Sequence, residues 1–238
     1  MRGLALLCLL GLAPVLRAED GAARPFRVVC FGDSITGDQP GQPYLHQYLK
    51  WTDLLGLVLE THLGEGRAEV LNRGHGGDGT SPRGDRPGAV RRLESQVLDL
   101  KPDVAVVLIG GNNFAARNRD PEEIADELRR DLTAMVRRMK EAGIRVLLVQ
   151  YHTPKAEDMS RVWTHLDRAN PIIAEVAAAE EVPTLELAPA FREAETRQPL
   201  HALTHPVDGV HLAPYGEIVV ARAVFGKLRE LGWLRGSP

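Results

Sequence analysis

Short apolar runs rich in β-branched residues alternate with longer helical patterns along the chain, and this alternation limits its fold more than any other feature. It is typical of parallel strands joined by crossover helices. Several runs lack the polar-apolar alternation of a half-exposed strand, which indicates a sheet covered by helices on both faces. The sequence therefore predicts an α/β fold, a three-layer, doubly wound sandwich around a five-stranded parallel sheet. The predicted strands are 27–31, 68–71, 104–109, 144–150 and 182–187.

Proline and capping residues mark the starts of helices. Asp-Pro-Glu-Glu at 120–123 offers an N-cap, a proline at the first helical position and a capping-box glutamate, so we expect a helix that ends at Gly143. Asn170-Pro171 repeats the cap and proline, which predicts that 158–181 is split into two helical pieces. Apolar spacing predicts a last helix over 214–231.

The N-terminal residues 1–18 have the pattern of a secretory signal peptide. Arg2 precedes a short apolar block over 4–10, and small residues follow, ending at Ala18. The block is too short for a permanent membrane span, so we expect export and no stable membrane insertion. A buried or frayed N-terminal helix is the alternative. Residues 19–238 would then form a single domain.

The net charge and the cysteine content limit which partners the protein could bind and whether disulfides could stabilise it. The formal net charge is −3, so nothing in the composition indicates a nucleic-acid partner. If the signal peptide is removed, Cys30 is the only remaining cysteine and no internal disulfide can form.

Three loops of unusual composition each follow a predicted strand, at 32–44, 72–88 and 110–120. In an open parallel sheet, ligands bind in the crevice beyond the carboxyl ends of the strands. We therefore expect these loops to meet in one neighbourhood.

Ser34 is the candidate nucleophile because, of the five serines in the chain, it alone directly follows a predicted strand. A serine at such a turn exposes its hydroxyl and places its own N–H near a helix N-terminus, where an oxyanion would be stabilised. The alternative is a helix-capping serine.

A serine needs a base, and the strongest histidine is His211, three residues after Asp208. In a turn-like backbone this spacing brings both side chains to one side, so Asp208 could hold one ring nitrogen while the other faces Ser34. His152, after the fourth predicted strand, is a weaker candidate.

Two segments could supply donors to an oxyanion. The glycine-rich stretch 72–79 lets backbone N–H groups approach a ligand, and it does not fit a phosphate-binding loop. Gly-Gly-Asn-Asn at 110–113 offers side-chain amides, although each asparagine could equally serve as a turn residue.

In order, these blocks resemble those of the SGNH hydrolases, the GDSL esterase and lipase family. Gly-Asp-Ser-Ile at 32–35 looks like the first block, 72–77 like the second, 110–113 like the third and Asp208-x-x-His211 like the last. The resemblance covers nearly the whole mature chain and implies the flavodoxin-like SGNH hydrolase fold. Asn113 departs from the family pattern, which usually has aspartate there.

The resemblance implies a serine esterase with catalytic residues Ser34, Asp208 and His211. The oxyanion hole would comprise Ser34, Gly77 and Asn112, and neither a cofactor nor a metal would be required. The implied partner is a small-molecule or carbohydrate ester, and the lack of a long apolar lid segment favours acetyl or other short acyl groups. A lysophospholipase or a thioesterase of the same family is the alternative.

Several further residues are candidates for contact with a substrate: Asp33, Asn113, Tyr44 and Arg83. Tyr44 lies near Tyr48 and Trp51, and such aromatic groups flank a sugar ring or, alternatively, pack in a helix core. Arg83, with Arg86, could meet an anionic group, with solvated loop charges as the plainer alternative.

Two other classes of function stay open from the sequence. A metal-dependent hydrolase could use the ligand types at His201, His205, Asp208 and His211. A non-catalytic module could bind an acylated glycan through the same pocket.

Overall fold

The computed structural model describes residues 24–37, 48–115, 118–152, 166–206 and 208–234. The predicted signal peptide, Tyr44 and the stretch 158–165 lie outside these residues. The predictions that concern them are therefore not tested.

The core of the molecule is a five-stranded, wholly parallel sheet with strand order β2-β1-β3-β4-β5. This is the order of flavodoxin-like folds, and it confirms the predicted α/β class. β2 extends three residues beyond its prediction. β5 is shorter at both ends, since it starts at Thr184 and stops before Leu187, which begins a helix. The strands are β1 (Phe26–Gly32), β2 (Ala68–Gly74), β3 (Val104–Leu108), β4 (Arg145–Gln150) and β5 (Thr184–Glu186).

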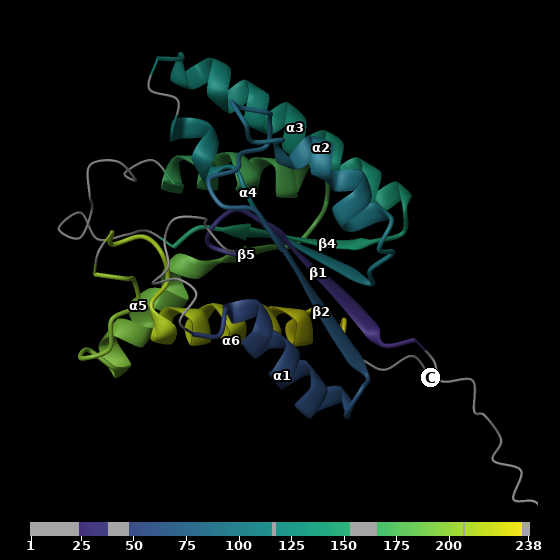
Figure 1. Ribbon diagram of the computed structural model, residues 1–238, viewed down its shortest axis with the longest axis vertical. Coiled ribbons are helices and arrows are strands. Elements are labelled where there is room, and N and C mark those ends of the chain that lie inside the picture. The colour runs from purple at the N-terminus through teal and green to yellow at the C-terminus, as the bar shows by residue number, and fades with distance from the viewer. Residues whose placement is uncertain (1–23, 38–47, 116–117, 153–165, 207, 235–238) are drawn as a thin grey trace, which may run out of the picture.

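Helices cover both faces of this sheet, as Figure 1 shows. One face carries α1 (Trp51–Leu63), α5 (Leu187–Arg197) and α6 (Pro214–Glu230), and α6 packs against both of the others. The other carries α2 (Ala89–Leu93), α3 (Pro121–Glu141) and α4 (Asn170–Ala179). Every residue of β3 is buried, as expected for a strand between two helical layers.

The N-cap and the proline at the start of α3 form as the sequence predicts. The Asp120 carboxylate accepts a hydrogen bond from the Glu122 backbone N–H at 3.0 Å, and Pro121 occupies the first turn. The helix ends at Glu141, and Gly143 follows with a φ of +74°.

Asn170 does not cap α4 as predicted. Residues 166–169 form a 3-10 turn that leads directly into α4, and no side-chain capping bond forms. The Asn170 amide instead accepts from the backbone N–H of Tyr151 at 2.8 Å and donates to its carbonyl at 3.0 Å. The asparagine therefore fixes the chain just after β4 rather than the start of a helix.

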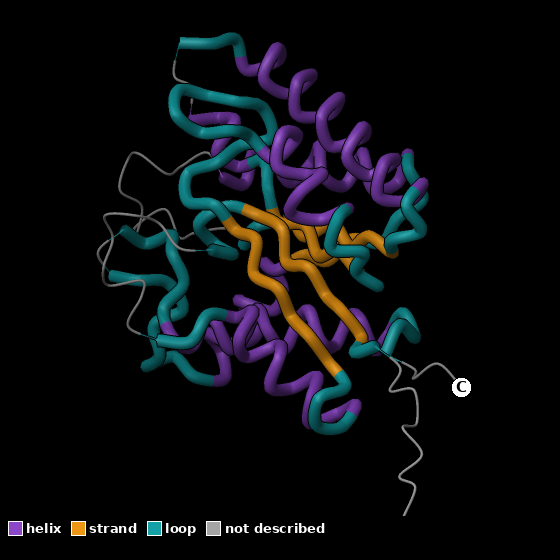
Figure 2. The backbone as a smooth tube through the Cα atoms, turned by 45° about the vertical axis from the view of Figure 1, so that its right-hand side comes forward, coloured by secondary structure: helices purple, strands orange, loops and turns teal. Residues whose placement is uncertain are grey.

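The winding of the sheet changes direction between β1 and β3, which are neighbours in the sheet. The crevice of a doubly wound sheet opens at this point, beyond the carboxyl ends of the strands. Loops gather at that edge of the sheet, seen at the left of Figure 2. The segments that follow β1 and β3 are those that carry Ser34 and Asn112.

Candidate active site

Ser34 lies in a tight turn that closes immediately after β1. The backbone N–H groups of Thr36 and Gly37 donate to the Asp33 carbonyl at 3.1 and 2.8 Å. A side chain on Gly32 would place its Cβ 2.5 Å from the Leu108 carbonyl oxygen, so the turn approaches β3 more closely than any other residue allows. The turn thus holds Ser34 at the carboxyl edge of the sheet.

The structure brings His211 and Asp208 to this serine. Asp208 Oδ1 accepts from the backbone N–H groups of Val210 and His211, both at 2.9 Å, and its Oδ2 lies 2.8 Å from His211 Nδ1. His211 Nε2 lies 2.9 Å from Ser34 Oγ. The three side chains that the sequence singled out therefore form one hydrogen-bonded chain.

The backbone around His211 is held by two side chains from other parts of the fold. His152 Nε2 lies 3.0 Å from the Val210 carbonyl, and the Tyr48 hydroxyl donates to the Leu212 carbonyl at 2.5 Å. The His152 ring stacks on Phe191, and burial lowers its pKa to about 4. His152 therefore supports the histidine loop as a neutral ring, and within the described residues no hydrogen bond joins it to Ser34.

Asp33 is fully buried and faces protein groups. Its carboxylate accepts from the Tyr151 hydroxyl at 2.5 Å, from the Ile35 N–H at 2.9 Å and from Asn112 Nδ2 at 3.3 Å. Burial raises its pKa to about 6, although the hydrogen bonds from Tyr151 and from the Ile35 N–H favour the ionised form. Contact between Asp33 and a substrate stays a prediction.

Tyr151 is a residue of this site that the sequence analysis missed. Its hydroxyl donates to Asp33 and accepts from the Gly111 backbone N–H at 3.1 Å, so it connects the loops that follow β1 and β3. Tyr151 could have been found from its position, because it directly follows the fourth predicted strand. Ligands bind beyond the carboxyl ends of parallel strands, which is the argument that selected Ser34.

Asn112 lies on a 3-10 turn, Gly111–Ala115, that begins soon after β3. Its amide nitrogen donates to the Asp78 carbonyl at 3.1 Å as well as to Asp33. The Asp78 carbonyl belongs to the glycine-rich loop, so Asn112 joins that loop to the serine turn.

Gly77 occupies a backbone conformation that favours glycine, with a φ of +71°. A Cβ there would lie 2.6 Å from Arg86 Nε. The loop is fixed beside the serine turn because the His75 N–H donates to the Gly32 carbonyl at 3.0 Å. The adjacent Asp78 carboxylate forms a buried ion pair with Arg92 at 2.7 Å.

Asn113 pairs with Thr80 through both ends of its amide. Asn113 Oδ1 accepts from the Thr80 backbone N–H at 2.9 Å, and Asn113 Nδ2 donates to the Thr80 hydroxyl at 2.8 Å. That hydroxyl donates to Asp131 on α3 at 3.0 Å. Because Asp131 supplies the acceptor in this chain, an amide rather than a second carboxylate suits position 113. Its predicted role in substrate contact stays untested.

Arg83 and Arg86 extend from the loop between β2 and α2 and lie close to Asn112 and Gly77. Arg83 Nη1 donates to the Asn112 carbonyl at 3.0 Å.

The metal-ligand set considered from the sequence does not assemble: within the described residues, no three His, Cys, Asp or Glu side chains gather to hold an ion. His201 instead packs its ring near that of Tyr215.

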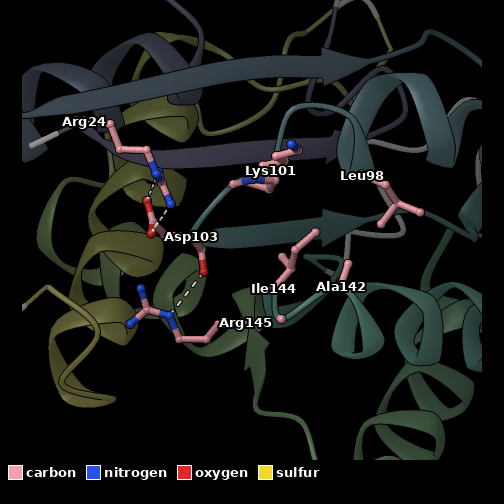
Figure 3. Close-up of a pocket in the computed structure, with 9 residues that line it drawn as sticks. Arg24, Leu98, Lys101, Asp103, Ala142, Ile144 and Arg145 are labelled. Atoms are coloured by element: carbon pink, nitrogen blue, oxygen red, sulfur yellow. Dashed lines mark hydrogen bonds and ion pairs between the residues drawn. The ribbon is translucent and has the colours of Figure 1, made fainter.

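A separate hollow of about 410 Å³ lies at the amino ends of the strands, as Figure 3 shows. There the Asp103 carboxylate accepts from both terminal nitrogens of Arg24, at 2.8 and 2.9 Å, and Arg145 Nε donates to the Asp103 carbonyl. These polar groups hold the strand ends together.

Among the helices of the described segments, none combines the length and the apolar character of a membrane span.

Comparison with known proteins places the chain among esterases. The sequence pattern of the GDSL-like Lipase/Acylhydrolase family matches residues 30–217. A comparison with curated protein sequences finds no match.

Solved structures share the fold at low sequence identity. The acetyl xylan esterase AlAXEase has a TM-score of 0.65 and 23% identity, over 85% of this chain and 99% of that one. A lipase/acylhydrolase from Enterococcus faecalis has a TM-score of 0.65 and 24% identity, over 89% and 98% of the two chains. For an acetylxylan esterase from Geobacillus stearothermophilus the TM-score is 0.60 and the identity 22%, over 89% and 97%.

Proposed function

The chain belongs to the GDSL-like lipase/acylhydrolase family and is a carboxylic ester hydrolase, and we propose that Ser34 is the nucleophile of this enzyme. The observation that carries the proposal is the hydrogen-bonded chain from Ser34 Oγ through His211 to Asp208, with distances of 2.9 and 2.8 Å. This arrangement of nucleophile, base and orienting carboxylate is recognised by geometry and not by sequence position.

The hydroxyl is activated by proton transfer to the imidazole. Ser34 Oγ attacks the ester carbonyl carbon while His211 Nε2 takes the hydroxyl proton, and the imidazolium then gives that proton to the departing alcohol. Asp208 keeps the proton of the ring on Nδ1 and stabilises the imidazolium charge. Water, deprotonated by the same ring, hydrolyses the acyl-enzyme and releases the acid.

The negative charge on the carbonyl oxygen needs fixed donors. We assign this role to the N–H groups of Ser34 and Gly77 and to the Asn112 side-chain amide, because the loops that carry them are joined by direct hydrogen bonds. Both N–H groups of the Asn112 amide are directed at Asp33 and Asp78 in this structure, so the oxyanion would replace the longer of these bonds, that to Asp33 at 3.3 Å, while the bond to the Asp78 carbonyl keeps the amide oriented.

The proposed substrates are acetyl or other short-chain esters, with acetylated carbohydrates as the natural class. Acetyl xylan esterases occur among the proteins of the same fold, and the sequence has no long apolar lid segment. The alternative is a lysophospholipase or thioesterase, since a lipase/acylhydrolase is equally similar in fold.

A panel of p-nitrophenyl esters, run beside acetylated oligosaccharides, tests the acyl preference. We expect rapid cleavage of acetyl esters and a steep decline with acyl length. A preference for long acyl chains or for thioesters would instead support the alternative. A fluorophosphonate label should react once per chain in the wild type and not in Ser34→Ala, whereas an unlabelled wild type would indicate the non-catalytic binding module.

Export after removal of residues 1–18 belongs to the same proposal, because acetylated polysaccharides lie outside the cytoplasm. The mature N-terminus of the protein recovered outside the cytoplasm of a producing cell would be read by mass spectrometry. A start at Glu19 is expected.

A further inference from the structure

Arg83 and Arg86 project from one tight turn whose backbone is fixed. The N–H of each residue donates to the carbonyl of the other, at 3.0 Å for the Arg83 N–H and 3.1 Å for the Arg86 N–H. The base of the loop is pinned because the Gly88 N–H donates to the buried Asp78 carboxylate at 3.0 Å. The two guanidinium groups are thus held near each other by a preformed backbone.

Both guanidinium groups lie against the residues assigned to the oxyanion hole. Arg83 donates to the carbonyl of Asn112 at 3.0 Å. Arg86 Nε lies 3.4 Å from the Gly76 carbonyl, and its guanidinium occupies the space that a side chain on Gly77 would need. The pair therefore lies beside the two loops that carry the proposed oxyanion donors Gly77 and Asn112.

Neither charge is neutralised by the part of the protein that the structure describes. Asp85, in the same turn, makes no ion pair with either arginine there. Asp78 raises the pKa of Arg83, but its carboxylate is already paired with Arg92 at 2.7 Å.

Among the described residues, the two fully buried cations each have a carboxylate partner. Lys50 pairs with Glu217 at 2.6 Å, and Arg92 pairs with Asp78. Arg83 and Arg86 are half-buried, and within the described part of the chain neither has a carboxylate partner. Burial together with the neighbouring Arg86 charge lowers the pKa of Arg83. Two positive charges that are close together and partly shielded from water repel each other and destabilise the fold, unless an anion binds between them.

Resting on the proposed esterase function, we propose that Arg83 and Arg86 form a subsite for a carboxylate carried by the ester substrate. The planar guanidinium matches a carboxylate through two parallel hydrogen bonds. Because the proposed acyl group is small, the carboxylate belongs to the alcohol part. The substrate class is therefore an acetylated acidic sugar or another acetylated hydroxy acid, and the hydrolysis itself is unchanged.

A matched pair of substrates tests this subsite. Acetate release from 4-acetoxybenzoate is compared with that from its uncharged methyl ester, and the ratio of the two kcat/KM values is the readout. We expect the wild type to prefer the carboxylate by about tenfold or more, because hydrogen bonds between a guanidinium and a carboxylate are charge-assisted and stronger than neutral ones. The ratio cancels any general change in turnover.

The variant Arg83→Gln/Arg86→Gln should bring this ratio to about one. The control Arg67→Gln/Arg91→Gln removes the same charge from two exposed positions outside the site, and it should keep the wild-type ratio. Arg83→Lys/Arg86→Lys should keep only part of the preference, because lysine retains the charge but not the planar fork. A preference that survives in the double glutamine variant, or that is equally lost in the control, overturns the proposal.

Failure of this inference is distinguishable from failure of the esterase assignment. If the wild type cleaves the methyl ester, loses this activity in Ser34→Ala and shows no preference for the carboxylate, the subsite is wrong and the esterase stands. If neither ester is cleaved, calorimetry of 4-hydroxybenzoate against methyl 4-hydroxybenzoate still decides the subsite. Tighter carboxylate binding that the double glutamine variant loses supports it, and equal binding rejects it.

Discussion

His211 Nε2 lies 2.9 Å from Ser34 Oγ, although the two residues are separated by 177 positions in the chain. Both are nearly inaccessible to solvent, with 4% of Ser34 and 1% of His211 exposed. A hydroxyl and an imidazole held at this distance and shielded from water are arranged for proton transfer, which needs heavy atoms about 2.6 to 3.2 Å apart.

Ser34→Ala should lose far more activity than Asn112→Ala. Removal of a nucleophile costs on the order of a millionfold in turnover, whereas removal of one oxyanion donor costs about a hundredfold to a thousandfold. Initial rates on p-nitrophenyl acetate, with circular dichroism to verify folding, provide the measurement. Equal and mild losses in the two variants would contradict the assigned roles.

Asp208→Ala should reduce turnover on the order of ten-thousandfold while KM changes little. The carboxylate holds His211 Nδ1 and also accepts two backbone N–H groups of the same turn, so its loss releases both the ring and the loop. Steady-state kinetics of the purified variant measure this. A loss confined to KM would show that Asp208 binds the substrate rather than orients the histidine.

Asn113→Asp should destabilise the protein by about 1 to 3 kcal/mol, because the Thr80 hydroxyl would face two carboxylates and have one proton to donate. Adding Asp131→Asn removes the second carboxylate and should recover part of this loss. A double-mutant cycle on free energies of unfolding measures the coupling. Strictly additive effects would mean that the two residues are not linked through Thr80.

The buried Asp33 carboxyl should make folding less favourable as pH rises from about 4 to 6. Its pKa is about 6 in the folded protein against 3.8 for the free side chain, so the protonated form is favoured by folding. The stabilisation is fully present below about pH 4 and lost above about pH 6, by about 3 kcal/mol. Asp33→Asn should lack this part of the pH dependence, which urea titrations at a series of pH values measure. Parallel curves for the two proteins would rule out the shift.

The buried His152 ring should act in the opposite direction over nearly the same range. Its pKa falls from 6.5 to about 4 on folding, so the contribution is present above pH 6.5 and is lost as pH falls towards 4. The loss amounts to about 3 kcal/mol. His152→Gln should lose less stability between pH 6.5 and 4 than the wild type, while His75→Gln, at an exposed position, should follow the wild type.

The architecture could be predicted from the sequence because its signals are local. Uninterrupted apolar runs mark strands buried on both faces, and the capping residues before α3 mark its start. The helix α5 was not predicted, because Leu187 continues the apolar run of β5 and no capping side chain separates the two. The Asn170 prediction was wrong because a tertiary contact with Tyr151 took the amide that the helix would have used.

The sequence alone determined which residue types form the candidate site and in what order they occur along the chain. A serine, a histidine with a nearby aspartate, and glycine-rich segments can be recognised directly in the sequence. Which partners they meet was decided by the tertiary structure. Three polar contacts join segments that are distant along the chain: Tyr151 with Asp33, Arg92 with Asp78, and Thr80 with Asp131. A buried polar group must find a partner wherever the fold places one, and that partner leaves no local pattern. Likewise, only the packed molecule shows that Arg83 and Arg86 have no carboxylate partner within the residues that the structure describes.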